Sequence, residues 1–315
     1  MTKQKNDNLS KGDFISFIAI LLLGITVFFG MNFQTLGDKV PSAAVAILLI
    51  ILMLVFVFLA AHAKAQDRNQ AMWRKVEYSM LGLYVLALIP CFVYSSKFFD
   101  IQFGKTDITA QVQADLDDIN NLFSDYSRKC ESRCGAFKTK LDAMVLDEQG
   151  RESIARILEI GKDSVSSARV NQVCESFVNM LKGNEYKALE AEKNNLEVNT
   201  QTNFKNWNLL FIPQYASELG SAKSKYATKL KEIYEKHTND LEKEVPEFQI
   251  ESYLSESNII TKFSSLWNFS IIGLLVVILL GGLGLVKYFL GAKRTVIEFT
   301  EGSINTIQED GGFTF

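Results

Sequence analysis

Four stretches of the chain are apolar on every side of a helix for about the length needed to cross a lipid bilayer. The hydrocarbon core of a bilayer requires about 20 residues of α-helix, whereas a soluble helix of that length keeps a polar face toward water. No Asp, Glu, Lys or Arg lies inside the four stretches, which are Phe14–Phe33, Ala43–Ala61, Tyr78–Ser96 and Leu266–Val286. The pattern therefore predicts an all-α membrane protein with four transmembrane helices.

The segment between the third and fourth stretches, residues 97–264, is polar overall but carries apolar residues at a helical period. Apolar residues recur every three or four positions over Ile108–Met144 and again over Tyr215–Leu241, which indicates helices with one apolar face. Two weaker helical stretches, 152–182 and 185–205, lie between them. Four such helices bury their faces most simply as an antiparallel bundle, so the sequence predicts a helical bundle inserted between the third and fourth spans.

The expected breaks between these helices fall at Gly150, at Gly183 and in the segment 206–213. An up-and-down order of four helices places the turns near Gly150 and near 207–212 together, at the end of the bundle far from the membrane. The outer two helices would then continue into the third and fourth spans.

Basic residues flank the predicted spans unequally and so indicate an orientation. The loop 63–77 carries Lys64, Arg68, Arg74 and Lys75, whereas Lys39 is the basic residue between the first two spans. Because cytoplasmic loops carry an excess of Lys and Arg, the loop 63–77 is predicted to be cytoplasmic. Alternation places both termini in the cytoplasm and residues 97–264 outside it; the termini carry Lys3, Lys5, Lys11, Lys287, Lys293 and Arg294, which agrees.

The expected organisation has four parts. They are 1–96 with the N-terminal cytoplasmic segment and the first three spans, 97–264 with the periplasmic helical domain, 265–290 with the fourth span, and 291–315 with a short acidic cytoplasmic tail. The cytoplasmic share of the chain is too small to fold as a catalytic or output domain.

Composition and charge narrow the chemistry. The net charge of −3 does not favour nucleic acid as a partner, and two histidines in the whole chain do not complete a usual zinc shell. No Ser-His-acid set is evident, so we expect no enzyme, no cofactor and no small-molecule substrate. The spans lack ionisable groups at membrane depth, which transport pathways use, and are predicted to anchor and pack; a pore that forms on oligomerisation is the alternative.

Three of the cysteines, Cys130, Cys134 and Cys174, lie in the predicted external domain, where an oxidising compartment permits disulfides. A chain reversal near residue 152 would place Cys130 opposite Cys174, whereas Cys134 would need a reversal near 154. We therefore expect a Cys130–Cys174 disulfide, with Cys134 free or available to another chain. The alternative is that all three are small buried hydrophobic residues.

The segment 206–213 is apolar without a helical or an alternating period. Its candidate partner-contact residues are Trp207, Leu209, Leu210, Phe211 and Ile212. An exposed apolar patch with a polar rim often marks a partner surface, so we expect a docking site here. The alternative is that Trp207 and Phe211 fold back and cap the end of the bundle core.

The layout of four spans with a large domain between the third and fourth is shared by two known families. Tetraspanins carry a Cys-Cys-Gly motif in that domain, and Cys130-Glu-Ser-Arg-Cys134-Gly135 does not match it. In topology and length the chain resembles the TssN family, an inner-membrane component of the type VI secretion systems of Bacteroidetes-type bacteria. The absence of an Asn-x-Ser/Thr acceptor from residues 97–264 suits a bacterial protein. The resemblance implies a multi-copy part of an envelope-spanning complex in the bacterial inner membrane, with residues 97–264 in the periplasm.

Three functions follow as hypotheses. The first is a structural subunit of a bacterial membrane complex, whose partners are other subunits, further copies of itself and the lipid bilayer. The second is a membrane sensor whose periplasmic bundle binds a ligand and signals through a separate cytoplasmic partner. The third is an effector or channel that assembles in the membrane.

Overall fold

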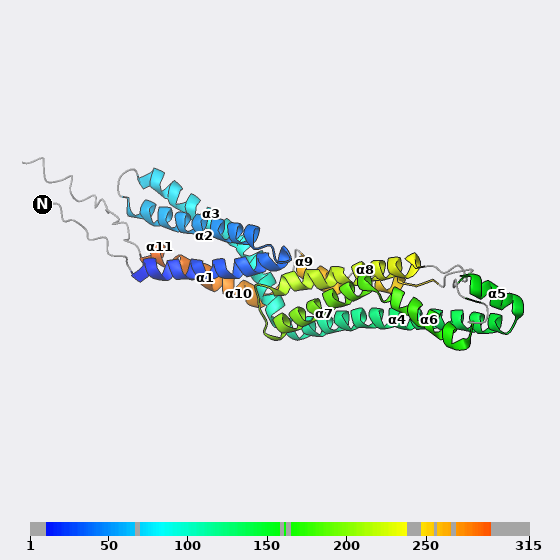
Figure 1. Cartoon of the computed structure of the whole chain (residues 1–315). Coiled ribbons are helices and arrows are strands. Elements are labelled where there is room, and N and C mark those ends of the chain that lie inside the picture. The colour runs from blue at the N-terminus through cyan, green and yellow to red at the C-terminus, as the bar shows by residue number, and fades with distance from the viewer. Residues whose placement is uncertain are drawn as a thin grey trace, which may run out of the picture. The chain divides into compact units, whose positions relative to one another are not determined.

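The computed structural model describes residues 11–66, 70–157, 161, 165–237, 247–254, 257–265 and 269–290 of the chain. Within these residues it contains helices and no strands (Figure 1). The all-α fold class is therefore confirmed for this part of the chain. The predicted acidic tail 291–315 and the basic residues Lys3 and Lys5 lie outside the described residues.

Four helical segments are long and apolar enough to cross a membrane, as the sequence pattern predicts. The helices are α1 (Lys11–Gln34), α2 (Lys39–Ala65), α3 (Gln70–Phe103) and α10 (Ile271–Gly284), which α11 (Val286–Leu290) continues. Each overlaps one of the four predicted stretches. A helix satisfies its backbone hydrogen bonds within itself, which is what a lipid environment demands of a single spanning segment.

The chain divides into two compact units by its internal contacts. The first unit comprises Met1–Gly24, Ile47–Cys91 and Val276–Phe315, and the second comprises Ile25–Ala46 and Phe92–Leu275. The second unit thus contains the predicted domain 97–264 together with the adjoining ends of α1, α2, α3 and α10.

In the first unit, one buried tyrosine packs closely against the glycines of α10. Tyr84 of α3 is fully buried, and its hydroxyl donates a hydrogen bond to the carbonyl oxygen of Gly281 at 2.8 Å. A Cβ atom on Gly284 would lie 2.3 Å from the same hydroxyl oxygen. Glycine at this position leaves room for the tyrosine hydroxyl, in keeping with the small residues that let membrane helices pack closely.

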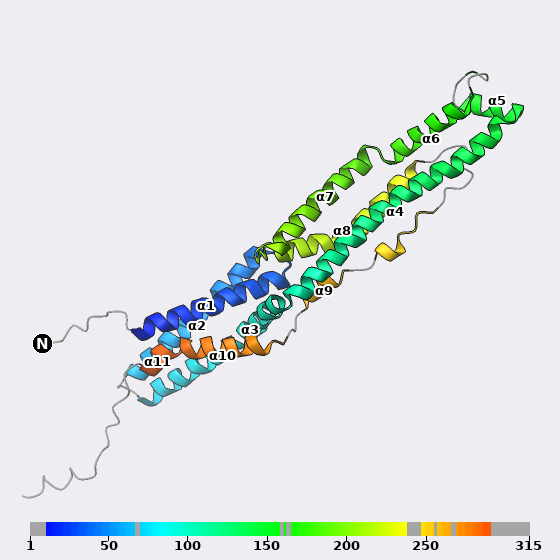
Figure 2. The ribbon, with the colours of Figure 1, turned by 90° about the horizontal axis from the view of Figure 1, so that it is seen from below.

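Helices α4 to α9 form most of the second unit (Figures 1 and 2). They are α4 (Lys105–Val145), α5 (Glu148–Ile157), α6 (Ser167–Leu181), α7 (Asn184–Lys205), α8 (Ile212–Lys236), the short 3₁₀ helix η2 (Glu251–Tyr253) and α9 (Asn258–Ser264). Local signals explain two of the helix starts: Ser166 caps α6 by accepting a hydrogen bond from the backbone N–H of Arg169, and Pro213 lies in the first turn of α8.

The main core of the second unit is a continuous cluster of buried apolar side chains. It draws on α4, α6, α7, α8, the segment 247–254 and α9, and it also includes Phe33 of α1 and Ile101 of α3. Its aromatic centre is Tyr126, whose ring stacks on Tyr186 at 5.3 Å between centroids and meets Tyr234 and Phe248 edge-on. The helical domain and the ends of α1 and α3 therefore share one core.

Helices α6 and α7 run one after the other along α4, antiparallel to it. The Cys174 thiol contacts Cys134, the Tyr126 hydroxyl donates to the Leu181 carbonyl at 2.7 Å, and Lys193 donates to Asn120 at 2.8 Å. As the residue number increases along α6 and α7, the number of the contacting residue on α4 decreases. Figure 2 shows α6 followed by α7 along α4. The Gly183 break is a kink, with Gly183 in an extended conformation as the N-cap of α7.

The predicted up-and-down order of the bundle is therefore wrong in one respect. The chain does not reverse at Gly183, so α7 returns to the end of the unit where α3 enters it. The segment 207–212 consequently lies at the α3 end and away from α5, contrary to the expectation that it shares the far end with the Gly150 turn. The physical reason is that the apolar faces of α6 and α7 both pack on α4, in successive places.

A second, smaller cluster lies where α4, α5 and α6 meet, and we call it the distal core. It consists of Leu141, Ile154, Ala155, Val165, Val170 and Cys174, with Cys134, Met144 and Val145 packed against it. Leu146, beside it, exposes 86% of its surface. Fewer elements cover the distal core than the main core.

Candidate interaction surfaces

The turn between α7 and α8 begins at Trp207, whose indole N–H and ring both make contacts with neighbouring residues. Its backbone adopts a positive φ of 48°, and its indole N–H donates to the Gln102 side-chain oxygen of α3 at 2.7 Å. The Lys105 ammonium lies 5.1 Å from the ring centroid, and Phe204 meets the ring edge-on. The turn is thus fixed to the α3 end by contacts that satisfy the indole.

The other predicted contact residues of this turn divide between core and surface. Ile212 is fully buried in the main core, and Leu209 packs against that core. Leu210 and Phe211 remain 39% and 38% exposed, and the Lys39 ammonium lies 4.0 Å from the centroid of the Phe211 ring. The capping alternative, in which Trp207 and Phe211 fold back on the core, therefore describes Trp207, which packs against the main core. It does not describe Phe211, which together with Leu210 keeps an exposed apolar edge.

The four cysteines, including Cys91 in α3, are free thiols in the structure. Cys130 lies in the main core and Cys174 in the distal core, so the predicted Cys130–Cys174 bridge is not formed. Cys174 lies instead beside Cys134, with its Sγ atom 3.1 Å from the Cys134 carbonyl oxygen. The chain reverses slightly later than the expected residue 152, because α4 runs on to Val145 and α5 adds to the turn.

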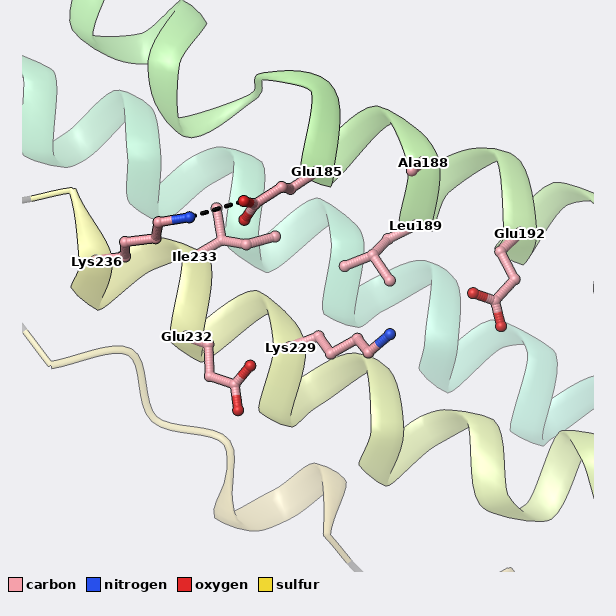
Figure 3. Close-up of a pocket in the computed structure, with 8 residues that line it drawn as sticks. All are labelled: Glu185, Ala188, Leu189, Glu192, Lys229, Glu232, Ile233 and Lys236. Atoms are coloured by element: carbon pink, nitrogen blue, oxygen red, sulfur yellow. Dashed lines mark hydrogen bonds and ion pairs between the residues drawn. The ribbon is translucent and has the colours of Figure 1, made fainter.

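A groove of about 420 Å³ runs between α7 and α8 (Figure 3). Leu189 and Ile233 supply its apolar lining, and charged side chains from both helices surround them. The full lining is Glu185, Ala188, Leu189, Glu192, Lys229, Glu232, Ile233 and Lys236. A groove with an apolar floor and charged edges suits a helix or an extended peptide of complementary charge.

The charges of the groove are partly paired across it. Lys236 and Glu185 form an ion pair of 2.7 Å at one end (Figure 3), and this hydrogen bond and charge hold the pKa of Glu185 below its usual range. Lys225 pairs with Glu192 further along, where a second groove of about 290 Å³ begins. No sequence pattern singles out these grooves, because mixed Glu and Lys on a helix is typical of any solvated face.

One face of α4 carries acidic residues that hold the returning chain. The Ser257 hydroxyl donates to Asp115 at 2.5 Å, and the Tyr253 hydroxyl donates to Asp125 at 2.7 Å. Lys223 of α8 pairs with Asp118 at 3.0 Å. Burial raises the pKa of Asp115 above its ordinary value, against the Ser257 hydrogen bond and the Lys223 charge. These contacts are structural: those of Tyr253 and Ser257 fasten a part of the chain that has little helix of its own, and that of Lys223 joins α8 to α4.

A polar cluster joins four helical segments of the first unit. Asp13 pairs with Lys287 at 2.7 Å, Lys64 donates to the Tyr288 carbonyl at 2.8 Å, and the Tyr288 hydroxyl donates to Glu77 at 2.7 Å. The four ionisable residues come from α1, α2, α3 and α11. Each flanks a predicted stretch, and alternation places all four flanks at the same end, which is the signal in the sequence that could have found the cluster.

Within the described ranges, no group of three or more His, Cys, Asp or Glu side chains is arranged to hold a metal ion. Comparisons of the chain with protein-family models, with curated proteins and with solved structures find no match.

Proposed function

We propose that the chain is a structural subunit of a bacterial envelope-spanning membrane complex. In this proposal the four spans anchor the protein in the inner membrane, both termini are cytoplasmic, and the helical domain 97–264 lies in the periplasm and docks partner proteins. The complex that the topological resemblance implies is that of a type VI secretion system. The partners are other membrane subunits and further copies of the chain.

The observation that carries the proposal is the mounting of the helical domain on the ends of its own spans. The main core includes Phe33 at the end of α1 and Ile101 at the end of α3 as well as α4, α8 and α9. Lys97 of α3 is buried and donates to the Lys262 and Ser265 carbonyl oxygens. A domain whose own core includes the ends of α1 and α3 is held by more than a single flexible linker, which suits a scaffold better than a freely tethered binding domain.

The polar cluster of the first unit supports the antiparallel order of the spans. Asp13, Lys64, Glu77 and Lys287 meet only if consecutive spans run in opposite directions. Together with the basic loop 63–77, this order favours an external domain 97–264.

The docking surface we favour is the groove between α7 and α8. It combines an apolar lining with an excess of Glu over Lys side chains. A partner could therefore bury apolar surface there and also recognise the charge. Purification of the tagged full chain in mild detergent, followed by mass spectrometry, tests the proposal. A stable complex with other envelope proteins is expected, and a chain that purifies alone from its native cells would contradict it.

A charge reversal locates the docking surface. Lys229→Glu changes a residue that lines the groove, and Lys140→Glu is the matched control on the exposed surface of α4. We expect the first variant to lose partners and the second to keep them, with equal amounts of folded protein in the membrane. Equal recovery of partners by both variants would remove the groove from the proposal.

A membrane sensor is the second candidate, and the same groove favours it. A volume of about 420 Å³ falls within the range of small-molecule sites. Paired Glu and Lys side chains suit a ligand that carries both charges, such as a free amino acid. A rise in thermal stability of the purified chain with one member of an amino-acid panel, and its loss in Lys229→Glu, would support the sensor over the scaffold.

A further inference from the structure

Cys134 and Cys174 face one another across the contact between α4 and α6. The Cys174 thiol donates to the Cys134 carbonyl oxygen at 3.1 Å, and the Cys134 side chain is also a hydrogen-bonding neighbour of that thiol. Contacts of this sulfur with both the backbone and the side chain of Cys134 bring the two residues close to the separation that a disulfide spans. Both belong to the distal core or pack against it.

We propose that Cys134 and Cys174 are the site of an intramolecular disulfide, formed when the helical domain meets a disulfide oxidant. The physiological setting rests on the proposed periplasmic location, where such oxidants maintain disulfides. The bond would join α4 to α6 and close a loop that contains α5 and the distal turn. It would therefore reinforce the part of the domain that has the smaller core.

The two thiols have different environments, which sets the order of the reaction. Cys134 is partly exposed and Cys174 is buried; burial first, and then the Cys134 side chain, raises the pKa of the Cys174 thiol to about 12. The accessible Cys134 thiolate attacks one sulfur of the oxidant R–S–S–R and releases one R–S⁻. Cys174, after giving up its proton, attacks the Cys134 sulfur and releases the second R–S⁻. The two thiol protons end on the two released thiols, so the oxidant is reduced to two R–SH.

Trypsin makes the linkage easy to assign. Cleavage after Arg133 separates Cys130, in the peptide 130–133, from Cys134, in the peptide 134–138, and Cys174 lies in 170–182. The purified full chain in mild detergent is reduced, incubated with oxidised glutathione, quenched with acid, alkylated and digested. We expect the 134–138 and 170–182 peptides to be linked.

The variants separate the steps. Cys174→Ser should stop at a stable mixed disulfide of glutathione on Cys134, whereas Cys130→Ser should form the same link as the unmodified chain. A persistent glutathione adduct on Cys134 in the unmodified chain, or a link through Cys130, would overturn the proposal. The same peptides from acid-quenched cells test location separately: a pair that links in detergent but is reduced in cells supports the disulfide site and contradicts the periplasmic placement.

A different observation concerns the exposed edge of the turn between α7 and α8. The turn between α1 and α2 joins two candidate spans and must therefore lie at a membrane surface. Lys39, at the start of α2, lies over the Phe211 ring, and Gly37 approaches Gln214 so closely that a Cβ would lie 3.0 Å from its backbone nitrogen. The turn 207–211 therefore lies at the same membrane surface.

From this placement we infer that Leu210 and Phe211 contact the lipid interface. Exposed apolar side chains beside lysines and a tryptophan suit the boundary between headgroups and acyl chains. The full chain in liposomes, with p-benzoyl-phenylalanine in place of Phe211, tests this on illumination. We expect a lipid adduct on the tryptic peptide that contains position 211 and none with the same photoprobe in place of Val198, an exposed residue of α7 outside this turn. Equal lipid labelling at the two positions, or none at position 211, would overturn it.

Discussion

The main core and the distal core share helix α4 but differ in what covers it. The main core is built by α4, α6, α7, α8, α9 and the segment 247–254, with residues from α1 and α3 at one end. The distal core is built by α4, α5 and α6 with Val165 before α6. Because stability grows with the apolar surface removed from water, the main core should determine whether the domain folds. The distal core should determine how ordered its far end is.

Removal of the aromatic centre of the main core should have the largest effect. Tyr126 is fully buried and contacts three other aromatic rings, so Tyr126→Ala should lower the free energy of unfolding by about 4 kcal/mol. Tyr126→Phe loses the hydrogen bond to Leu181 and should cost about 1 kcal/mol. Denaturant unfolding of the full chain in detergent measures both, and similar losses in the two variants would contradict the role of the ring.

Replacement of Arg133, which lies between the two cores, should have the next largest effect. Its side chain is buried, donates to the Tyr234 and His237 carbonyl oxygens, and packs over the Phe177 ring. Arg133→Met should cost about 3 kcal/mol, because the last carbonyls of α8 lose charged donors. Arg133→Lys should restore only part of that loss, since an ammonium lacks the planar fork. Full recovery of the stability in Arg133→Lys would show that a positive charge is sufficient at this position, and would contradict the role of the guanidinium geometry.

Truncation within the distal core should have a smaller and local effect. Leu141 is fully buried there, and Leu141→Ala should cost about 2 kcal/mol. The loss should appear as faster amide hydrogen exchange in α5 and α6, with α8 unchanged, because weakly packed regions open separately from the rest. Faster exchange spread evenly over α8 would mean that the two cores are one cooperative unit.

The acidic face of α4 should make the stability of the helical domain depend on pH. Because burial raises the pKa of Asp115 above 3.8, the folded state binds the proton more tightly than the unfolded state. Its contribution to stability is therefore greatest at low pH and falls as pH rises from 3.8 through the raised folded pKa. Asp115→Asn should lessen this fall relative to the unmodified chain, measured by denaturant unfolding from pH 3.8 to neutrality; parallel curves would contradict it.

A surface ion pair should have the smallest effect. Lys225 and Glu192 are both nearly half exposed, so Lys225→Gln should cost less than about 0.5 kcal/mol. Lys223→Gln is the matched change at a lysine whose side chain is 10% exposed and pairs with Asp118, and it should cost about 1 kcal/mol. A larger loss at Lys225 than at Lys223 would contradict the ranking by burial.

The spans and the two longest helices of the domain 97–264, α4 and α8, could be predicted from the sequence because their signals are local. Uninterrupted apolar residues indicated the spans. The apolar stripe over Ile108–Met144 predicted α4 (Lys105–Val145) to within a few residues at each end. The direction of the chain after a break could not be predicted in the same way. A glycine such as Gly183 ends a helix whether the chain turns back or only kinks, and the outcome depends on which face of α4 is still uncovered.

The candidate sites followed from that one difference. Because α7 continues along α4 toward α3, Trp207 contacts Gln102 and Lys105. The distal end of the helical domain is formed with α5 instead. The cysteine pair shifted by one helical turn, from Cys130 to Cys134, because the length of the distal turn depends on packing among α4, α5 and α6. Neither result leaves a local pattern in the sequence.

Cysteine labelling shows on which side of the membrane the helical domain lies. Val198→Cys and Met72→Cys place thiols at exposed positions of α7 and of the start of α3, in a chain that also carries Cys134→Ser. We expect a membrane-impermeant maleimide to label position 198 in cells with a permeabilised outer membrane, and to label position 72 only after the inner membrane is disrupted. The reverse order of labelling would place residues 97–264 in the cytoplasm and contradict the proposed periplasmic location.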